Sequence, residues 1–157
     1  LGCGALGAAT ILRTSWVYGP VGRNFLLTML RLHRFKAEAG EPLSVVADQV
    51  GCPTSTLGLA NACWTVIQRQ VGGMHHWSDA GAASWYDFAV AIGELAVARG
   101  LIDKAAEVLP IPASSYPTPA QRPAYSLLDC NATRLQLQLQ PQHWRSALEG
   151  VIRNVEA

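Results

Sequence analysis

The chain has 157 residues, of which 50% are hydrophobic and 15% are charged, a balance that favours a packed globular domain over a disordered chain. A net charge of +1 without a basic run gives no electrostatic footprint for nucleic acid. No apolar run approaches the roughly 18 residues of a membrane span, and the first residues lack the charged leader of a signal peptide. The four cysteines have no CxxC spacing, so we expect reduced thiols in a cytoplasmic protein, without a disulfide framework or a metal site.

The first part of the chain has strand and helix patterns separated by a loop. Residues Thr10 to Thr14 form a β-branched and apolar run typical of a buried strand, and a segment rich in glycine and proline follows. A helix is predicted over residues 24–39. Asn24 is placed to cap its first turn, and Gly40 and Pro42 stop its last one.

The same alternation continues beyond Pro42. A strand is predicted from Leu43 to Asp48, and a helix from about Thr56 to Gln70. The segment from Met74 to Asp79 is short, and we expect Met74 and Trp77 to point inward.

The last part is predicted to be mostly helical. Ser84 and Asp87 have the spacing of a capping box for a helix that runs to about Arg99. Five of the nine prolines lie between Pro110 and Pro123, which excludes a helix or a central strand there. A helical turn near residues 131–135 and a final helix over 142–155 follow. Strands alternating with helices predict an α/β fold with some parallel pairing.

Residues 2–7 have the pattern GxGxxG, which is found in dinucleotide-binding loops. That chemistry requires a strand before the glycines and a helix after them, because the first amides of the helix hold the pyrophosphate. Here no strand can precede residue 2, and the pattern that follows is the strand at Thr10 to Thr14. We therefore interpret these glycines as a flexible connection and not as a coenzyme site.

Four segments together are more specific than any one of them: RTSWVYGPVGRNF (13–25), DQVGCPTSTLGLA (48–60), SWYDFA (84–89) and YPTPAQRPAYSLLD (116–129). Their order and spacing resemble the carboxy-terminal half of dTDP-4-dehydrorhamnose reductases, which belong to the extended short-chain dehydrogenase/reductase superfamily. RTSWVYG and YPTPAxRP are the sharper pieces, since GxPT is shared with many nucleotide-sugar enzymes.

The resemblance implies the last parallel strands of a Rossmann-type fold and a small α/β substrate-binding domain. Residues of about 1–23 and 50–80 would complete the Rossmann sheet, and about 24–49 and 81–157 would form the substrate-binding domain. The implied reaction reduces dTDP-4-dehydro-L-rhamnose to dTDP-L-rhamnose with NADPH or NADH, for cell-surface polysaccharide. The sequence has no YxxxK, the catalytic pair of the family, and no coenzyme loop. We therefore expect the isolated chain to be inactive, to bind no coenzyme tightly and to depend on an amino-terminal Rossmann half.

Five residues are predicted to contact the dTDP-sugar: Trp16, Asn24, Gln49, Arg122 and Ser126. Trp16 follows the carboxyl end of a predicted strand, where open α/β sheets place ligands, and an indole can stack on a deoxysugar. The resemblance also implies a sugar-contacting tryptophan there, and the alternative is a core residue. The amide of Gln49 donates and accepts. Arg122 has a planar fork of donors for a diphosphate that Ser126 could extend, although an ordinary surface arginine is an even alternative. Asn24 caps its helix, contacts the ligand, or does both.

Ser15 and Tyr18 share the loop of Trp16 and are the candidates for lining the nicotinamide, with a structural role as the alternative for Tyr18. The sequence also departs from the family pattern at two positions. Many relatives have an acidic residue in place of Gly58 and a second basic residue in place of Gln121. These departures would change the detail of the nucleotide contact.

Two other functions are open at this point. The first is a non-catalytic binding subunit of the same fold, such as the regulatory subunit of methionine adenosyltransferase; an upstream YxxxK with a glycine-rich loop would favour the enzyme instead. The second is another nucleotide-sugar enzyme, such as an epimerase or a dehydratase, which TSWVYG and YPTPAQRP disfavour. Because its strands would be cut from their sheet, we expect the isolated chain to form a homodimer, exchange elements or be partly disordered.

Overall fold

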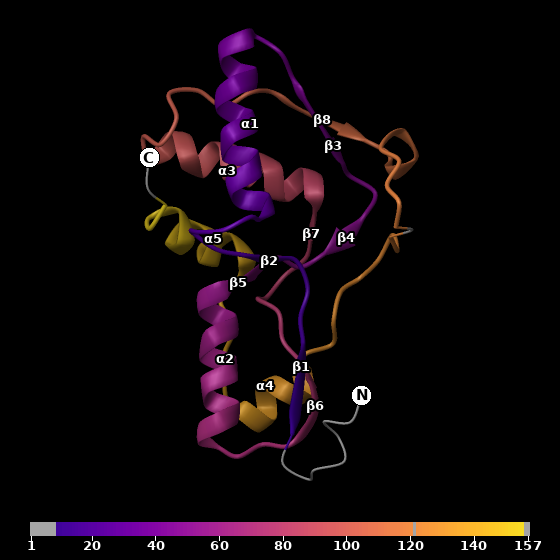
Figure 1. Cartoon of the computed structure of the whole chain (residues 1–157), viewed down its shortest axis with the longest axis vertical. Coiled ribbons are helices and arrows are strands. Elements are labelled where there is room, and N and C mark those ends of the chain that lie inside the picture. Colours follow the sequence, from indigo (N-terminus) through magenta and orange to yellow (C-terminus); the bar gives the residue numbers. More distant parts are fainter. Residues whose placement is uncertain (1–8, 121, 156–157) are drawn as a thin grey trace.

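The computed structural model describes residues 9–120 and 122–155, in which short strands alternate with helices (Figure 1). The GxGxxG pattern at residues 2–7, Cys3 and Gln121 lie outside the described residues. The elements in chain order are β1 (Thr10–Arg13), β2 (Val17–Tyr18), α1 (Phe25–Ala39), β3 (Leu43–Val46), β4 (Val50–Gly51), β5 (Thr54–Ser55), α2 (Thr56–Gln68), β6 (Gly73–His76), β7 (Ala83–Ser84), α3 (Trp85–Ala98), β8 (Val108–Ile111), a 3-10 turn (Ala113–Ser115), α4 (Asn131–Leu137) and α5 (Trp144–Ile152).

The strands pair two by two. β1 pairs with β6, β2 with β5 and β3 with β8, all in parallel, whereas β4 and β7 are antiparallel. The predicted α/β fold with parallel pairing is therefore confirmed. β8 contains Pro110, and it tolerates this proline because it pairs only with β3 and is an edge strand.

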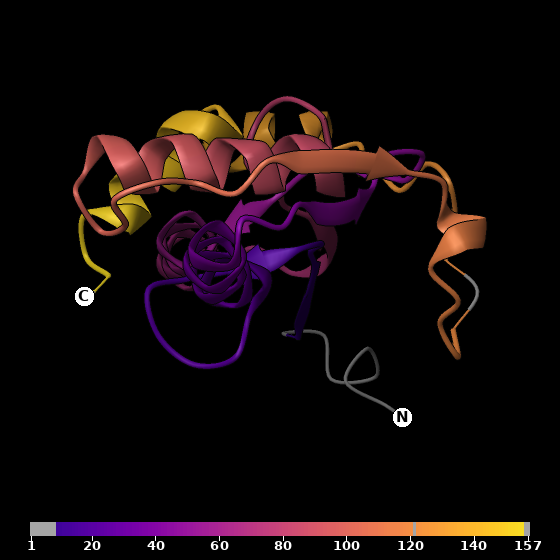
Figure 2. The same cartoon turned by 90° about the horizontal axis from the view of Figure 1, so that it is seen from above.

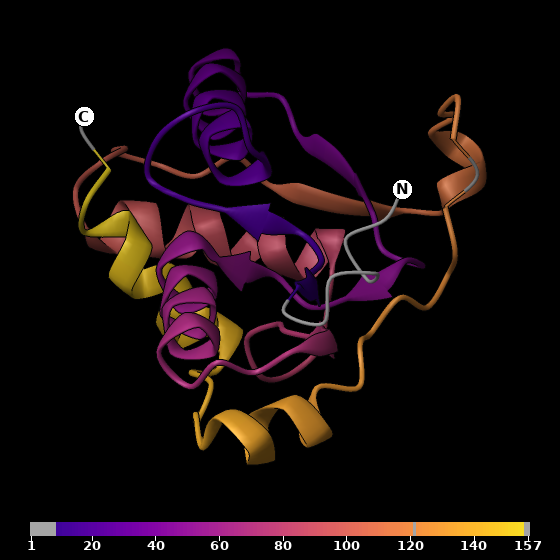
Figure 3. The ribbon, with the colours of Figure 1, turned by 60° about the horizontal axis from the view of Figure 1, so that its bottom comes forward.

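The elements form two groups. Helices α1, α3 and α5 lie together in the upper half of Figure 1, with the β3–β8 pair beside α3. Helices α2 and α4 and the β1–β6 pair form the lower half, which Figure 3 brings forward. The β2–β5 and β4–β7 pairs lie between the two halves, so residues of both groups meet there.

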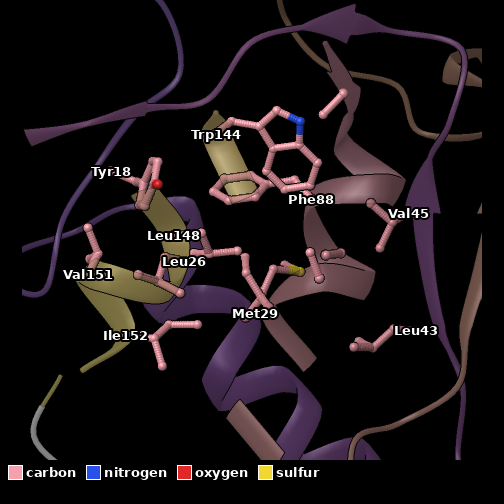
Figure 4. Close-up of a cluster of buried hydrophobic side chains, with 14 of the residues drawn as sticks. Tyr18, Leu26, Met29, Leu43, Val45, Phe88, Trp144, Leu148, Val151 and Ile152 are labelled. Atoms are coloured by element: carbon pink, nitrogen blue, oxygen red, sulfur yellow. The ribbon is translucent and has the colours of Figure 1, made fainter. Parts of the chain in front are cut away.

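The main hydrophobic core fills the upper group and is centred on Phe88 of α3 (Figure 4). The ring of Phe88 meets the edge of Tyr18 at 5.0 Å, stacks on Phe25 at 5.4 Å and meets Trp144 at 6.0 Å, measured between ring centroids. These partners come from β2, the start of α1 and the start of α5. Phe88 of α3 therefore joins the β2–α1 region near the start of the chain to α5 near its end.

A second, smaller core lies between α2, α4 and β1 in the lower group. Its buried members are Ala62, Val66, Trp77 and Leu137. Leu137 belongs to this cluster although the predicted boundary assigns residues 81–157 to the substrate-binding part. α4 thus packs against α2, and the division of the chain into two domains stays a prediction.

The predicted helix ends are confirmed where local hydrogen bonds determine them. Asn24 Oδ1 accepts from the amide of Leu27, and Gly40 ends α1 in the left-handed conformation with φ of 68°. At α3, the amide of Asp87 donates to Ser84 Oγ at 3.1 Å and the amide of Ser84 donates to Asp87 Oδ2 at 2.8 Å, which completes the capping box. Among residues 9–120 and 122–155, no helix combines the length and the hydropathy that crossing a bilayer requires.

The prediction that Met74 points inward is wrong. Met74 is 54% exposed, and its register partner Ile11 on β1 is 42% exposed. Alternate residues of a strand face opposite sides, and only the side with Leu12 and His75 is covered within the described residues. Trp77, the other inward residue of the prediction, is buried.

His33 of α1 makes the stability of the fold depend on pH. The residue is fully buried, and its Nε2 lies 3.0 Å from the carbonyl oxygen of Ala89. Burial lowers the pKa of His33, and the carbonyls of Ala89 and Ala106 only partly oppose this effect.

Because its folded-state pKa is depressed, the stability that His33 contributes is complete above its unfolded pKa and is lost as the pH falls below about 6.5. We expect urea unfolding to show a free energy that falls faster with acidification in the wild type than in His33→Gln. The difference cannot exceed about 1.4 kcal/mol per pH unit, the limit for one proton. Identical pH profiles of the two proteins would contradict this prediction.

Candidate functional site

Trp16 lies between β1 and β2 in a strained backbone conformation. Its φ is 47°, a left-handed value that is unfavourable for a bulky side chain and persists only where the surroundings enforce it. Two hydrogen bonds hold the loop. The amide of Thr54 donates to the carbonyl of Trp16 at 3.1 Å, and Ser15 Oγ donates to the carbonyl of Cys52 at 3.1 Å. The loop is thereby fixed against the segment that joins β4 to β5.

The indole of Trp16 stacks on that of Trp85, the first residue of α3. The ring centroids are 3.6 Å apart and the planes differ by 9°. Gly51 of β4 approaches the same indole so closely that a Cβ atom there would lie 2.6 Å from Cε2 and 2.9 Å from Nε1 of Trp16. Trp16 as a residue nevertheless remains partly exposed.

β4 connects this tryptophan pair to the segment that follows β8. On one side, Val50 pairs with Ser84 of β7. On the other side, the amide of Val50 donates to the carbonyl of Ala124 at 2.8 Å, and the amide and hydroxyl of Ser126 both donate to the carbonyl of Val50. Trp16 and Ser126, 110 positions apart in the chain, are therefore both held against the two residues of β4.

Gln49 immediately precedes β4 and is half-buried. Within the described residues, its side-chain amide makes no hydrogen bond, whereas the carboxylate of its neighbour Asp48 accepts from the amide of Ala113 at 2.8 Å. Asp48 thus braces the segment after β8. The amide of Gln49 keeps its donors and acceptor available next to Val50.

Arg122 lies in the proline-rich segment between β8 and α4. Figure 2 shows that the first part of this segment, in orange, extends away from the helices. Arg122 is exposed and forms no ion pair or side-chain hydrogen bond with any described residue. Its chain position places it two residues before Ala124, which is anchored on Val50. The structure therefore brings together Trp16, Gln49 and Ser126, and attaches Arg122 to them through a short linker.

Asn24 has its whole side chain engaged within the protein. Its Oδ1 caps α1, and its Nδ2 donates to the carbonyls of Gly19 at 3.0 Å and Val21 at 3.1 Å. These bonds close the loop that follows β2. The arrangement supports the capping alternative, and a ligand contact would require one of these bonds to break.

Tyr18 and Ser15 do not fit a nicotinamide contact in this structure. Tyr18 is 1% exposed, and its ring packs on Phe88. Burial raises the pKa of its hydroxyl, with smaller contributions from Asp79 and Cys52. The hydroxyl of Ser15 already bonds to Cys52. A nicotinamide contact at either residue would require the packing of Tyr18 or the hydrogen bond of Ser15 to change.

A buried carboxyl group that sequence reasoning missed lies beside this site. Asp79 follows β6 and is 2% exposed; its Oδ2 accepts from the amide of Ser55, the residue that caps α2, at 2.9 Å. Burial raises the pKa of Asp79, opposed by the hydrogen bonds from Ser55 and by the charge of Arg134. The only sequence signal was its position just past a short strand.

Asp79 also lines a groove of about 430 Å³. Polar groups on this groove include Ser78, Tyr125, Asn131 and Arg134. The guanidinium of Arg134 donates to the carbonyls of Ser78 and Asp79 at 3.3 Å each. These hydrogen bonds give Arg134 a structural role in the wall of the groove.

The buried thiol of Cys52 lies in an environment that disfavours its reactive thiolate form. Cys52 is fully buried, and burial followed by the charge of Asp79 raises its pKa to about 12. Cys52, Cys63 and Cys130 are free thiols. The part of the chain that the structure describes contains no cluster of three or more His, Cys, Asp or Glu side chains able to hold a metal ion.

Comparison with known families decides the relationship. The family profile described as RmlD substrate binding domain matches residues 4–157. The chain belongs to this family. Its resemblance to dTDP-4-dehydrorhamnose reductases, inferred from the four segments, is thereby confirmed.

Individual relatives of this RmlD substrate binding domain agree. The chain is 38% identical over 147 residues to the dTDP-4-dehydrorhamnose reductase of Aggregatibacter actinomycetemcomitans, covering 90% of this chain and 49% of that protein. It is 42% identical over 145 residues to the spore coat polysaccharide biosynthesis protein SpsK of Bacillus subtilis, covering 92% and 47%. A crystal structure of dTDP-4-dehydrorhamnose reductase from Bacillus anthracis in complex with NADP aligns with a TM-score of 0.80 at 35% identity, over 94% of this chain and 48% of that one. The chain spans about half the length of the curated relatives it matches.

Gly58, in the first turn of α2, lies close to Asp79 and Ser55. A Cβ atom at Gly58 would lie 2.8 Å from Asp79 Oδ1 and 2.9 Å from Ser55 Oγ. The carboxyl group of Asp79 accepts from the amide of Ser55 at the start of α2. The absence of a side chain at Gly58 therefore makes room for Asp79.

Proposed function

We propose that this chain is the sugar-nucleotide-binding portion of an oxidoreductase that reduces dTDP-4-dehydro-L-rhamnose to dTDP-L-rhamnose with NADPH or NADH. Membership of the RmlD substrate binding domain family supports the proposal, as do the names of the relatives. The observation that carries it is the convergence of Trp16, Gln49 and Ser126 on the two residues of β4.

Each of these residues has a role that follows from its chemistry. Trp16, which remains partly exposed, offers the apolar surface of an indole to a deoxysugar. The free amide of Gln49 suits a polar edge of the sugar or the base. Arg122 offers a planar fork of donors to the diphosphate. Ser126, four residues later, anchors this segment on Val50, and its hydroxyl would have to leave the Val50 carbonyl to donate to a phosphate. We assign only structural roles to Asn24, Ser15 and Tyr18.

The chain supplies binding groups and no proton donor for the ketone. The YxxxK pair of the family is absent from its sequence, so the hydride and the proton must come from groups outside this chain. We infer that an amino-terminal Rossmann half is its natural partner, and that residues of about 1–23 and 50–80 pack against that half.

Exposed apolar side chains support this partner. Leu57, Trp64 and Ile67 are 77%, 60% and 63% exposed and follow one another at helical spacing along α2. Ile11 and Met74 on the β1–β6 pair are exposed as well. Apolar surface of this extent is typical of an interface that another part of the protein or a second copy covers.

Titration of dTDP into the chain by calorimetry tests the proposed function. We expect measurable binding by the wild type and a loss of about 10- to 100-fold in affinity for Arg122→Ala, because a charge-assisted phosphate contact contributes about 1.5–3 kcal/mol. Arg122→Lys should recover part of the loss, since an ammonium keeps the charge but not the fork of donors.

Arg31→Ala is the matched control, because Arg31 is an exposed arginine on α1 that forms no ion pair with any described residue and is not among the proposed ligand contacts. The proposal fails if the wild type gives no heat with dTDP, or if Arg122→Ala and Arg31→Ala bind equally well.

A further inference from the structure

The conformation of Trp16 is enforced from outside its own loop. Trp16 is one of three non-glycine residues with positive φ among the described residues. Such a conformation costs of the order of 1–3 kcal/mol and persists only where neighbouring structure determines it. The partners that hold Trp16 are therefore as important for the placement of its indole as Trp16 itself.

Trp85 is the first of these partners. Isolated aromatic rings prefer an offset or edge-to-face arrangement over a direct face-to-face pair. The two indoles are nevertheless almost parallel, at 9°, with centroids 3.6 Å apart. Trp85 is held in place by the capping box of α3 and by Phe25, whose ring centroid lies 4.7 Å from its own. Trp85 thus presents a rigid face against which Trp16 rests.

Gly51 is the second partner. Its lack of a Cβ atom leaves the space in which the Cε2, Cζ2 and Nε1 atoms of Trp16 lie, all within 2.9 Å of the position that a Cβ would occupy. Gly51 pairs with Ala83 in the β4–β7 ladder, and Ser84, the next residue, caps the helix that begins at Trp85. The ladder therefore fixes Gly51 and Trp85 relative to each other, and the indole of Trp16 relative to both.

We propose that Gly51 and Trp85 are positioning residues that hold the Trp16 indole in its strained conformation and thereby determine how the site discriminates a dTDP-sugar from dTDP. The inference rests on the proposed function, because it takes Trp16 as the sugar contact. Specificity for the sugar then depends on a residue that has no side chain and on the tryptophan that stacks on Trp16.

Gly51→Ala tests this inference, because both tryptophans remain and only the space beside the indole is lost. Two stacked indoles give an exciton couplet in far-ultraviolet circular dichroism, which we expect in the wild type and expect to be weakened in Gly51→Ala. Gly150→Ala is the matched control, since a Cβ there meets no atom within 4 Å and α5 accepts alanine. It should keep the couplet.

The ligand measurement compares dTDP with dTDP-L-rhamnose by calorimetry in the same proteins. In the wild type and in Gly150→Ala, we expect dTDP-L-rhamnose to bind more tightly than dTDP. In Gly51→Ala that preference should fall by about two- to tenfold, the range of one aromatic contact, while the affinity for dTDP is unchanged. Trp85→Phe, with Trp64→Phe as its exposed control, should lower the preference in the same way and provides the test if Gly51→Ala does not fold.

The outcomes separate the two proposals. A wild type that binds neither ligand overturns the proposed function, and this inference with it. A wild type that binds both ligands equally, or variants that lose the couplet yet keep the preference for dTDP-L-rhamnose, overturn this inference and leave the binding of dTDP standing. An unchanged couplet in Gly51→Ala would show that Gly51 does not position Trp16, and this result would also overturn the inference.

Discussion

Replacing Phe88 by alanine is expected to lower the free energy of unfolding by about 3–5 kcal/mol, the range for large-to-small changes at a buried phenylalanine. Phe88 is 1% exposed and contacts Tyr18, Phe25 and Trp144. The substitution removes the ring that joins β2, α1 and α5 to α3, and it leaves a cavity that the capped helices can fill only in part. Urea unfolding followed by circular dichroism measures the change.

Two further variants make the Phe88 prediction specific. Phe88→Leu keeps most of the apolar volume and should cost about 1–2 kcal/mol. Phe35→Ala, at a phenylalanine of α1 that is 61% exposed, should change stability by less than about 0.5 kcal/mol. If Phe88→Ala and Phe35→Ala were equally stable, Phe88 would not be at the centre of the core.

The second large effect is expected at Asp79. Asp79→Ala should cost about 2–3 kcal/mol, because the buried amide of Ser55 loses its acceptor at the start of α2. Asp79→Asn should stay within about 1 kcal/mol of the wild type. The amide oxygen can accept from the same N–H, and its nitrogen can donate to Ser55 Oγ, which lies 3.4 Å from Asp79 Oδ1.

The pH dependence of these proteins distinguishes the roles of charge and hydrogen bonding. Because the folded-state pKa of Asp79 is raised, the folded protein binds this proton more tightly than the unfolded chain. The stability contributed by Asp79 therefore increases as the pH falls through the folded-state pKa, and the increase is complete below about 3.9. Asp79→Asn should lack this increase. A loss of stability in Asp79→Asn as large as in Asp79→Ala would show that the negative charge, and not the acceptor, stabilises α2.

Local structure was predictable because its causes lie within a few residues. The cap at Asn24, the capping box of Ser84 and Asp87, and the end of α1 at Gly40 each depend on neighbours up to four positions away. The helices therefore begin and end close to their predicted bounds. The prolines between 110 and 123 likewise restricted that segment without any knowledge of its surroundings.

The direction of individual side chains was harder to predict. Met74 was expected to point inward, but the sheet face that carries it is uncovered within the described residues. Tyr18 is close to Trp16 in the chain, yet Tyr18 is buried in the core while Trp16 remains partly exposed. Apolar composition alone does not indicate which face of a two-stranded pair will be covered.

The sequence by itself determined the alternation of strands and helices, the helix caps and the family, since these depend on short-range hydrogen bonds and on motifs contiguous in the chain. Tertiary structure alone decided that Gly51 and Trp85 enclose Trp16, that Ser126 bonds to Val50, and that Asp79 caps α2 at Ser55. These contacts join residues from 24 to 76 positions apart in the chain. These contacts form only when the right elements pack together. That tertiary arrangement is selected by close packing of the core and by the pairing of buried hydrogen-bonding groups, which the hydrophobic pattern of a single segment does not encode.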